Sequence, residues 1–272
     1  MEKMASIFYS ECFDICYNED YIKSIAFDDI KEIKSMQPQR STNTQSKALD
    51  YDAGLRAHFQ RVYNTMALGL VLTGAIAFGV ASVPALFNAF NGTIIGLVIM
   101  LAPLGIVFFG LTPSKVQRMK ASTVAGLYYL LTALFGISLS YIFLVYSSES
   151  IARVFFITAG MFAGTSIYGY TTKKDLSGMG SMMMMGLIGI IIAMVVNIFL
   201  QSSMLQFVIS GLGVIIFTGL TAWDTQRIKE TYSNAYDRSQ TSKLATMGAL
   251  SLYLNFINLF MMLLRLFGSS RS

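Results

Sequence analysis

The side chain in this sequence that most suggests chemistry is that of an acidic residue that lies in an apolar segment. Asp224 lies in the run 219–226, and nothing between it and Tyr232 forbids a helix from continuing. Such a helix would place Asp224 about 12 Å from its end. An ionisable side chain at that depth in a membrane is costly and indicates a functional site. The alternative is that Asp224 ends the helix at the membrane surface, beside Arg227.

A stripe of polar residues lies downstream, in the last apolar run of the chain. Its members are spaced 4, 3, 4 and 3 residues apart and therefore share one face of an α-helix: Ser251, Asn255, Asn258, Met262 and Arg265. Lipid cannot satisfy two carboxamides and a guanidinium, so this face should point into the protein. Two simpler interpretations remain open. The asparagines could be hydrogen-bonding groups between helices, and Arg265 could extend to the far interface.

Hydrolytic chemistry finds little support in the sequence. An intramembrane aspartyl protease needs two apposed carboxylates, and Asp224 is the only acid expected within the membrane. A serine protease needs a base, and the single histidine, His58, precedes the first apolar run. Cys12 and Cys16 have no Cys or His nearby to complete a zinc site, so we predict free thiols. No nucleotide-binding or zinc motif is recognisable, so we expect neither a cofactor nor an enzyme.

The elements that position these groups are predicted from composition. The 272 residues are 54% hydrophobic and only 13% charged, with a mean hydropathy of +0.57. A soluble domain carries about 25% charged residues, so a multi-pass membrane protein is indicated. A membrane-spanning helix needs about 20 mostly apolar residues. Seven such runs follow residue 61: 62–82, 92–111, 123–146, 154–170, 181–200, 206–224 and 245–267.

Charge distribution predicts the orientation of these runs. The loops after the second, fourth and sixth runs hold nine Lys and Arg residues, whereas the alternate loops hold only Arg153. By the positive-inside rule the N-terminus should be cytoplasmic and the C-terminus should lie on the opposite side. The net charge of +5 then faces an anionic lipid leaflet, and no basic patch with interleaved aromatics suggests nucleic acid.

Three parts of the chain differ in composition. Residues 1–50 are polar and predicted to be a mostly disordered cytoplasmic tail, with one short helix conceivable at 20–35. Residues 51–268 form the predicted transmembrane domain, and residues 269–272 a short C-terminal tail. About 60 residues precede the first run and no small-residue cleavage site follows it, so we expect it to remain as a span rather than a signal peptide.

Small and flexible residues within the runs predict helix packing. Gly160 and Gly164 form a GxxxG pattern, and Gly186 and Gly189 follow the methionine run 182–185. Small residues let helix backbones approach closely. The methionines are expected to fill lipid-facing and interhelical gaps, because no His or Cys accompanies them in the spans to suggest copper binding.

Four segments carry a resemblance to a known family. The stretches 219–229, 249–260, 150–156 and 168–180 closely resemble the bacterial branch of the Bax inhibitor family, also called the transmembrane Bax inhibitor motif family. The resemblance covers about residues 50–268. It implies an all-α membrane protein, a seven-transmembrane-helix bundle in which the last helix is central and wrapped by the other six. It also implies location in the bacterial inner membrane.

The resemblance further implies a pH-sensitive calcium leak gated by two hydrogen-bonded aspartates in the sixth and seventh helices. Two carboxylates in contact share a proton and titrate in two steps, and calcium prefers oxygen-rich anionic sites. Asp224 matches the first aspartate and is the residue expected to meet calcium transiently. Asn255 occupies the second position. An Asp–Asn pair can hydrogen-bond but cannot hold a shared proton between two acids, so altered pH gating is expected.

Two function classes follow from the resemblance. The first is an ion-conducting leak that uses the polar residues between the sixth and seventh helices. The second is a non-conducting modulator that binds other membrane proteins, such as a membrane-anchored ATP-dependent protease or stress and cell-death factors. A calcium flux assay in liposomes separates the two, because a pure binding partner shows no flux.

Overall fold

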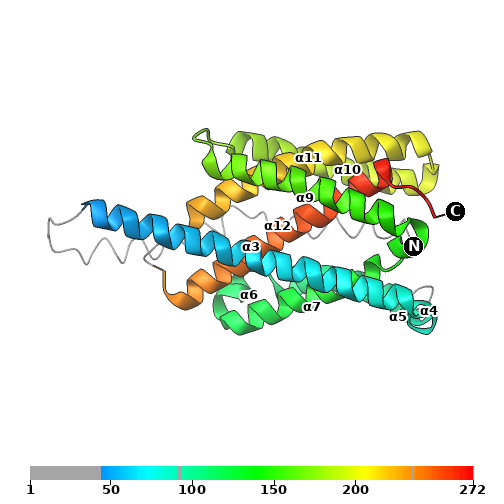
Figure 1. Cartoon of the computed structure of the whole chain (residues 1–272), viewed down its shortest axis with the longest axis horizontal. Coiled ribbons are helices and arrows are strands. Elements are labelled where there is room, and N and C mark those ends of the chain that lie inside the picture. The colour runs from blue at the N-terminus through cyan, green and yellow to red at the C-terminus, as the bar shows by residue number, and fades with distance from the viewer. Residues whose placement is uncertain (1–43, 91–93, 234–235, 272) are drawn as a thin grey trace.

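The architecture is a bundle of long α-helices around one buried helix (Figure 1). The computed structural model describes residues 44–90, 94–233 and 236–271. The predicted tail of residues 1–50, with its short helix at 20–35 and its two cysteines, therefore lies outside the described residues except for 44–50. Those residues belong to the first described helix.

The helices follow the apolar runs, because a chain in lipid must satisfy every backbone polar group within its own segment. Their bounds are α3 (Thr44–Ser82), α4 (Pro84–Phe90), α5 (Ile94–Gly105), the π-helical turn η1 (Ile106–Gly110), α6 (Pro113–Arg118), α7 (Ala121–Leu139), α8 (Ile142–Val145), α9 (Ser148–Thr171), α10 (Ser177–Leu200), α11 (Ser203–Thr231) and α12 (Arg238–Phe267). The all-α class predicted from composition is confirmed.

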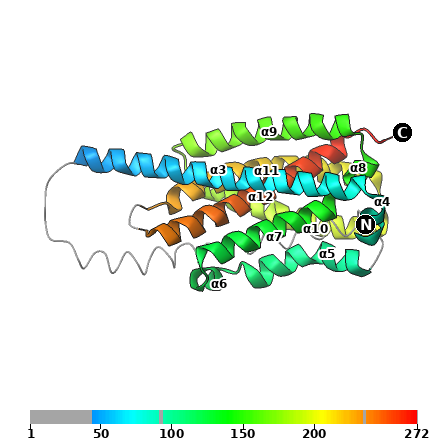
Figure 2. The same cartoon turned by 60° about the horizontal axis from the view of Figure 1, so that its bottom comes forward.

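Six of the described helices are long and apolar enough to cross a membrane. The second predicted run is the exception. It forms the 12-residue α5, with Pro103 inside it, and the five-residue η1. Proline removes one backbone donor and its ring clashes with the preceding turn, which favours an irregular helix here. The count of seven spans is therefore not confirmed, although α5 runs beside α7 (Figure 2).

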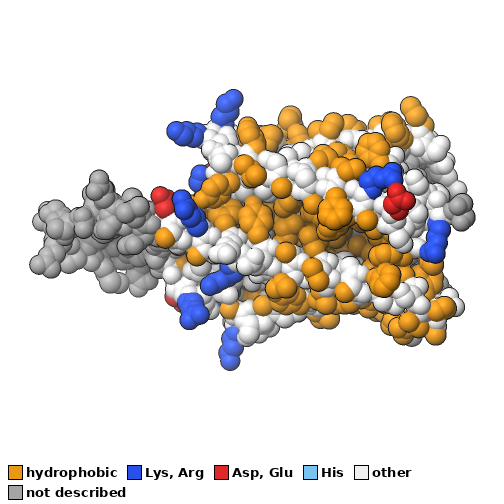
Figure 3. Space-filling model, viewed as in Figure 1, with side chains coloured by type: hydrophobic (Ala, Val, Ile, Leu, Met, Phe, Trp, Pro, Cys, Tyr) orange, Lys and Arg blue, Asp and Glu red, His pale blue; other side chains and the backbone are white. Residues whose placement is uncertain are grey.

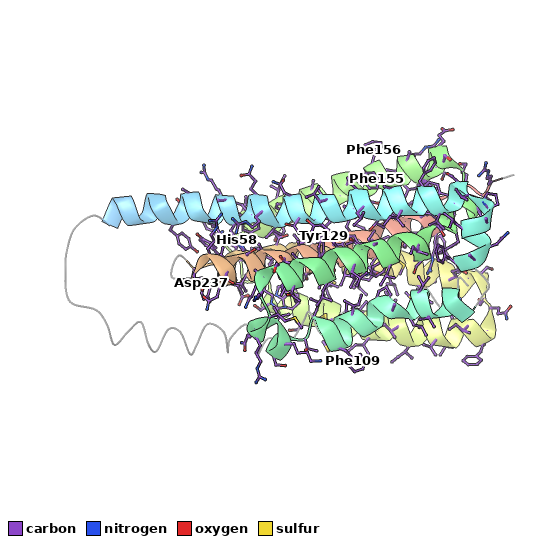
Figure 4. All side chains as sticks on the ribbon, turned by 90° about the horizontal axis from the view of Figure 1, so that it is seen from below. His58, Phe109, Tyr129, Phe155, Phe156 and Asp237 are labelled. Atoms are coloured by element: carbon purple, nitrogen blue, oxygen red, sulfur yellow. The ribbon has the colours of Figure 1, made fainter. Side chains whose placement is uncertain are left out.

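The last helix is central, as the family resemblance implied. In the apolar window of α12, 94% of the residues are buried inside the bundle. It packs against α11, α3, α9 and α7. α12 begins at Arg238, earlier than the apolar run, because the Asp237 side chain accepts a hydrogen bond of 2.6 Å from the Gln240 N–H and caps the helix. Asp237 lies at this end of α12 in Figure 4.

The two ends of the bundle differ in charge. Lys and Arg side chains gather at the end where α3 enters, and hydrophobic side chains cover the middle of the molecule (Figure 3). The basic loops meet at that end: Lys243 Nζ donates to the Gln117 carbonyl, and Lys229 Nζ donates to the Tyr170 carbonyl. The C-terminal residues lie at the other end, where Ser270 pairs with Tyr146.

Of the glycines expected to pack helices, Gly186 does so, because an added Cβ there would lie 2.9 Å from Ile216 of α11, whereas the others do not. An added Cβ at Gly160, Gly164 or Gly189 would meet nothing within 4 Å, so the GxxxG pattern does not pack against another described part of this chain. The physical reason is that these glycines lie on the faces of α9 and α10 turned away from α11. Close approach occurs instead at Gly169, against the Ala222 carbonyl, and at Gly180, against the Trp223 ring.

The methionines lie where the sequence predicted. Met182 and Met185 are more than half exposed on the outer surface of α10. Met183 is turned inward and packs over Gly219 of α11. Its flexible side chain fills the space that a glycine leaves between two helices.

Candidate functional site

The candidate site lies between α11 and α12, two long helices that pack closely against each other. α11 does not end at Asp224 but continues to Thr231, which contradicts a helix end at Asp224. The depth of Asp224 relative to the membrane surface stays a prediction. Asp224 is 2% exposed. A carboxylate held this deep needs hydrogen-bond donors or a cation, because burial removes its hydration.

Two donors from α12 meet this carboxylate. Ser251 Oγ donates to Asp224 Oδ2 at 2.7 Å, and Asn255 Nδ2 donates to the same oxygen at 2.6 Å. Ser251 and Asn255 are one helical turn apart, so both reach one atom from the same face. Both donors converge on one carboxylate oxygen, and hydrogen bonds to an ionised acceptor are short and strong.

The oxygens of the stripe are left without donors. Asn255 is fully buried and Asn258 is 1% exposed, and the carboxamide oxygen of each lacks a hydrogen-bond partner. Asn258 uses its Nδ2 to donate to the Leu254 carbonyl at 2.9 Å. Buried polar atoms are normally paired, so two unpaired oxygens on the helix that faces a buried carboxylate are an exception that needs an explanation. Together these atoms present oxygen ligands of the kind that a hard cation such as calcium prefers.

The stripe then becomes apolar toward the other end of the bundle. Met262 packs where a Cβ on Gly213 of α11 would lie, so the two helices approach closely there. At 1.5 Å per residue Met262 lies about 10 Å beyond Asn255. We call the interface from Asp224 and Ser251 to Gly213 and Met262 the α11–α12 seam. Its polar atoms are confined to one half, and a methionine closes the other.

Arg265 is not brought to Asp224. It lies ten residues beyond Asn255, which is about 15 Å along the helix. Arg265 is partly exposed near the end of α12, and among the described residues it forms no ion pair. This position fits a side chain that extends to the interface.

Sequence reasoning missed the contacts that brace α11 beside the site. Gln226 Nε2 donates to the Lys174 carbonyl and Gln226 Oε1 accepts from the Leu176 N–H, both at 2.8 Å. Thr225 Oγ1 lies 3.3 Å from Ser166 Oγ of α9. Gln226 and Thr225 adjoin Asp224 in an apolar segment, and that position was the available signal. They fix the rotation of α11 and therefore where Asp224 points.

The loop acid nearest this bracing is not a pH sensor near neutrality. Asp175 is exposed and accepts a hydrogen bond from the Ser177 N–H at 2.8 Å. Hydrogen bonding from Ser177 lowers the pKa of Asp175 below its ordinary value. Asp175 is therefore ionised throughout the neutral range, and its charge does not change there.

The fold and the buried seam define a multi-pass α-helical membrane protein with a polar site inside its bundle. The family model described as "Inhibitor of apoptosis-promoting Bax1" matches residues 55–272. The chain therefore belongs to the Bax inhibitor family, and the family resemblance of its motifs is confirmed.

Three relatives show how much of the chain is shared. The protein is 43% identical over 222 residues to the inner membrane protein YbhL of Escherichia coli K12, covering 80% of this chain and 94% of YbhL. It is 46% identical over 242 residues to an uncharacterised protein of Caulobacter vibrioides, covering 85% and 96% of the two chains. It is 45% identical over 232 residues to the uncharacterised protein RP147 of Rickettsia prowazekii, covering 85% and 98%.

Proposed function

We propose that the protein is a calcium-permeable leak pathway of the bacterial inner membrane, with the α11–α12 seam as its ion-binding part. The observation that carries the proposal is the buried Asp224 carboxylate. Asn255, which contacts it, and Asn258, about one turn further along the facing helix, each have an unpaired carboxamide oxygen. A buried anion attracts a cation, and carboxamide oxygens of the facing helix could add to its coordination. The cation can also leave, because one carboxylate binds calcium weakly.

The pH response should differ from that of a carboxylate pair. Asn255 supplies an amide donor where a second acid would share a proton. Asp224, held by two donors in its ionised form, has no second acid with which it could share a proton. Flux should therefore vary little between about pH 6 and 8.

The orientation of the protein is part of this proposal. The basic loops form one end of the bundle and the C-terminus lies at the other, which supports a cytoplasmic N-terminus and a C-terminus on the opposite side. A reporter fused after Ser272 should lie outside the cytoplasm and one at the N-terminus inside. Finding both on one side would leave α5 and η1 as a segment that does not cross.

The deciding experiment is calcium flux into liposomes that contain the purified full chain and an internal calcium indicator. We expect flux above that of protein-free liposomes, with similar rates at pH 6, 7 and 8. A steep pH dependence would contradict the role given to Asn255. Absence of flux at every pH would refute conduction and favour the alternative role, a modulator that binds other membrane proteins such as an ATP-dependent protease.

A further inference from the structure

A second site lies on the outer side of the bundle, away from the α11–α12 seam. A cavity of about 450 Å³ lies between α3 and α9. This volume is within the range of roughly 300–1,000 Å³ that is typical of small-ligand sites. Figure 1 shows α3 and α9 on the same face of the molecule, and Figure 3 shows that hydrophobic side chains cover this face.

The lining of the cavity is apolar over most of its length. Phe59 of α3 and Phe162 of α9 are both 6% exposed and form part of its walls, and Ala163 lies at its exposed side. The Phe59 ring meets the Tyr170 ring edge to face at 4.9 Å, which connects the two helices at one end of the cavity. Phe162 lies two turns deeper along α9, about 12 Å from Tyr170. The lining therefore extends about 12 Å along α9, which is long enough to lie against part of a hydrocarbon chain.

Positive charge lies at only one end of the cavity. Arg56, an exposed residue of the lining, precedes Phe59 by one turn on the side of the basic loops. Lys229 Nζ lies 5.3 Å from the Tyr170 ring centroid and donates to the Tyr170 carbonyl. The described lining residues include no acid. This end would attract an anionic group, and the other end would reject one.

A hydroxyl group lies between the basic end of the cavity and its apolar end. Ser166 is 5% exposed, lines the cavity, and lies one turn deeper than Tyr170. Thr225 Oγ1 gives its proton to the Thr221 carbonyl at 2.8 Å, so at 3.3 Å it can only accept from Ser166 Oγ. The Ser166 hydroxyl can rotate from this long contact toward an acceptor in the cavity. From the basic end inward, the order is cation, aromatic edge, hydroxyl and apolar wall. A phospholipid presents phosphate, glycerol, ester carbonyl and acyl chain in a matching order.

We propose that this cavity binds an anionic phospholipid from the leaflet at the basic end, with its phosphate at Arg56 and one acyl chain between Phe59 and Phe162. Basic pockets between transmembrane helices are suited to anionic headgroups. The exposed side of the cavity opens where Ile167, 64% exposed, faces the surroundings of the bundle. A lipid can therefore enter sideways from the bilayer. This binding does not depend on whether the protein conducts calcium.

The test is lipid binding to the delipidated full chain in detergent, measured by native mass spectrometry during titration. The probes are phosphatidylglycerol, phosphatidylcholine and glycerol phosphate, which has the headgroup charge without acyl chains. We expect phosphatidylglycerol to bind about fivefold more tightly than phosphatidylcholine, as one cationic contact of about 1 kcal/mol supplies. Glycerol phosphate should not displace the lipid. Displacement would refute the acyl-chain part of the proposal.

Two variants, each with a matched control, locate the site. Ala163→Trp fills the cavity and should weaken phosphatidylglycerol binding about tenfold. Ala152→Trp, at an exposed position of the same helix outside the cavity, should not. Arg56→Gln should remove the preference for the anionic lipid, whereas Arg61→Gln, exposed on the same helix, should keep it. Equal effects of variant and control in either pair would overturn the proposal, because binding would then reflect nonspecific annular lipid or general charge.

Discussion

Two polar clusters lie on different faces of α12, and their hydrogen bonding differs. The first is the α11–α12 seam around Asp224. The second, which we call the Thr73 cluster, joins α3, α7 and α12: Thr73 Oγ1 donates to the Thr132 carbonyl at 2.9 Å and lies 2.7 Å from the Tyr253 hydroxyl. Tyr253 and Asn255 are two residues apart, which is about 200° around a helix.

The Thr73 cluster is neutral and closed. Because Thr73 gives its proton to the Thr132 carbonyl, the Tyr253 hydroxyl donates to Thr73. Aromatic contacts surround Tyr253, with the rings of Tyr128 and Phe135 at 6.0 and 5.8 Å. This arrangement uses both hydroxyl protons of the pair within the protein, as is typical of polar packing between helices.

The α11–α12 seam, by comparison, contains an ionisable group and unpaired hydrogen-bond acceptors. One oxygen of Asp224 accepts two hydrogen bonds, while the carboxamide oxygens of Asn255 and Asn258 accept none. Burial alone does not separate the two clusters, since both are buried. They differ in the ionisable group and the unpaired acceptors of the seam, and the proposal of a functional seam rests on that difference.

The largest expected effect comes from removing the charge of the seam. Asp224→Asn keeps the size of the side chain and a hydrogen-bonding group, but leaves the seam without an anion. Calcium flux in liposomes should fall by about tenfold or more, because the site loses its only charged ligand. Asp237→Asn, an exposed acid at the start of α12, is the control and should conduct normally. Unchanged flux in Asp224→Asn would place the ion route elsewhere.

Asn255→Asp should make the seam respond to pH, which the neutral Thr73 cluster does not do. The new acid would lie beside Asp224 Oδ2 and form a pair that shares a proton. Flux should then change by severalfold between about pH 6 and 8, where we expect the parent protein to vary little. Thermal unfolding of the same variant is the companion measurement. A strongly destabilised protein with flat flux would show that position 255 serves packing alone.

Ser251→Ala should have an intermediate effect. It removes one of the two donors to Asp224 Oδ2, while Asn255 still holds the carboxylate. Loss of one charge-assisted hydrogen bond costs roughly 1.5–3 kcal/mol in the ionised state, so the pH dependence of flux should increase. A flux assay over pH, with Ser242→Ala on the same helix as the control, measures this. A flat profile equal to that of the control would remove Ser251 from the site.

Tyr253→Phe should have the smallest effect on transport. It deletes the hydrogen bond to Thr73 and keeps the ring in its aromatic contacts. Stability in detergent should drop by about 0.6–1.5 kcal/mol, the range for interhelical hydrogen bonds. Calcium flux should remain at the parental rate. A loss of flux comparable to that of Asp224→Asn would contradict the division between a structural and a functional face of α12.

Much of this protein follows from the sequence. Apolar runs determined the long helices, since a membrane-embedded backbone has few other solutions, and the 4-3-4-3 spacing placed Ser251, Asn255 and Asn258 on one face. The scarcity of acids after residue 61 singled out Asp224. These features are local, because they depend only on composition and helical periodicity.

Other features required the tertiary structure, because they depend on how distant helices pack. Only the packed bundle shows that Asn255 donates to Asp224, that Arg265 stays apart, and that Gly160 and Gly164 face outward while Gly169 and Gly180 make the close contacts. The cavity beside Arg56 also depends on how distant helices pack. Its walls come from residues about 100 positions apart, and no pattern within either helix marks the space that they leave between them.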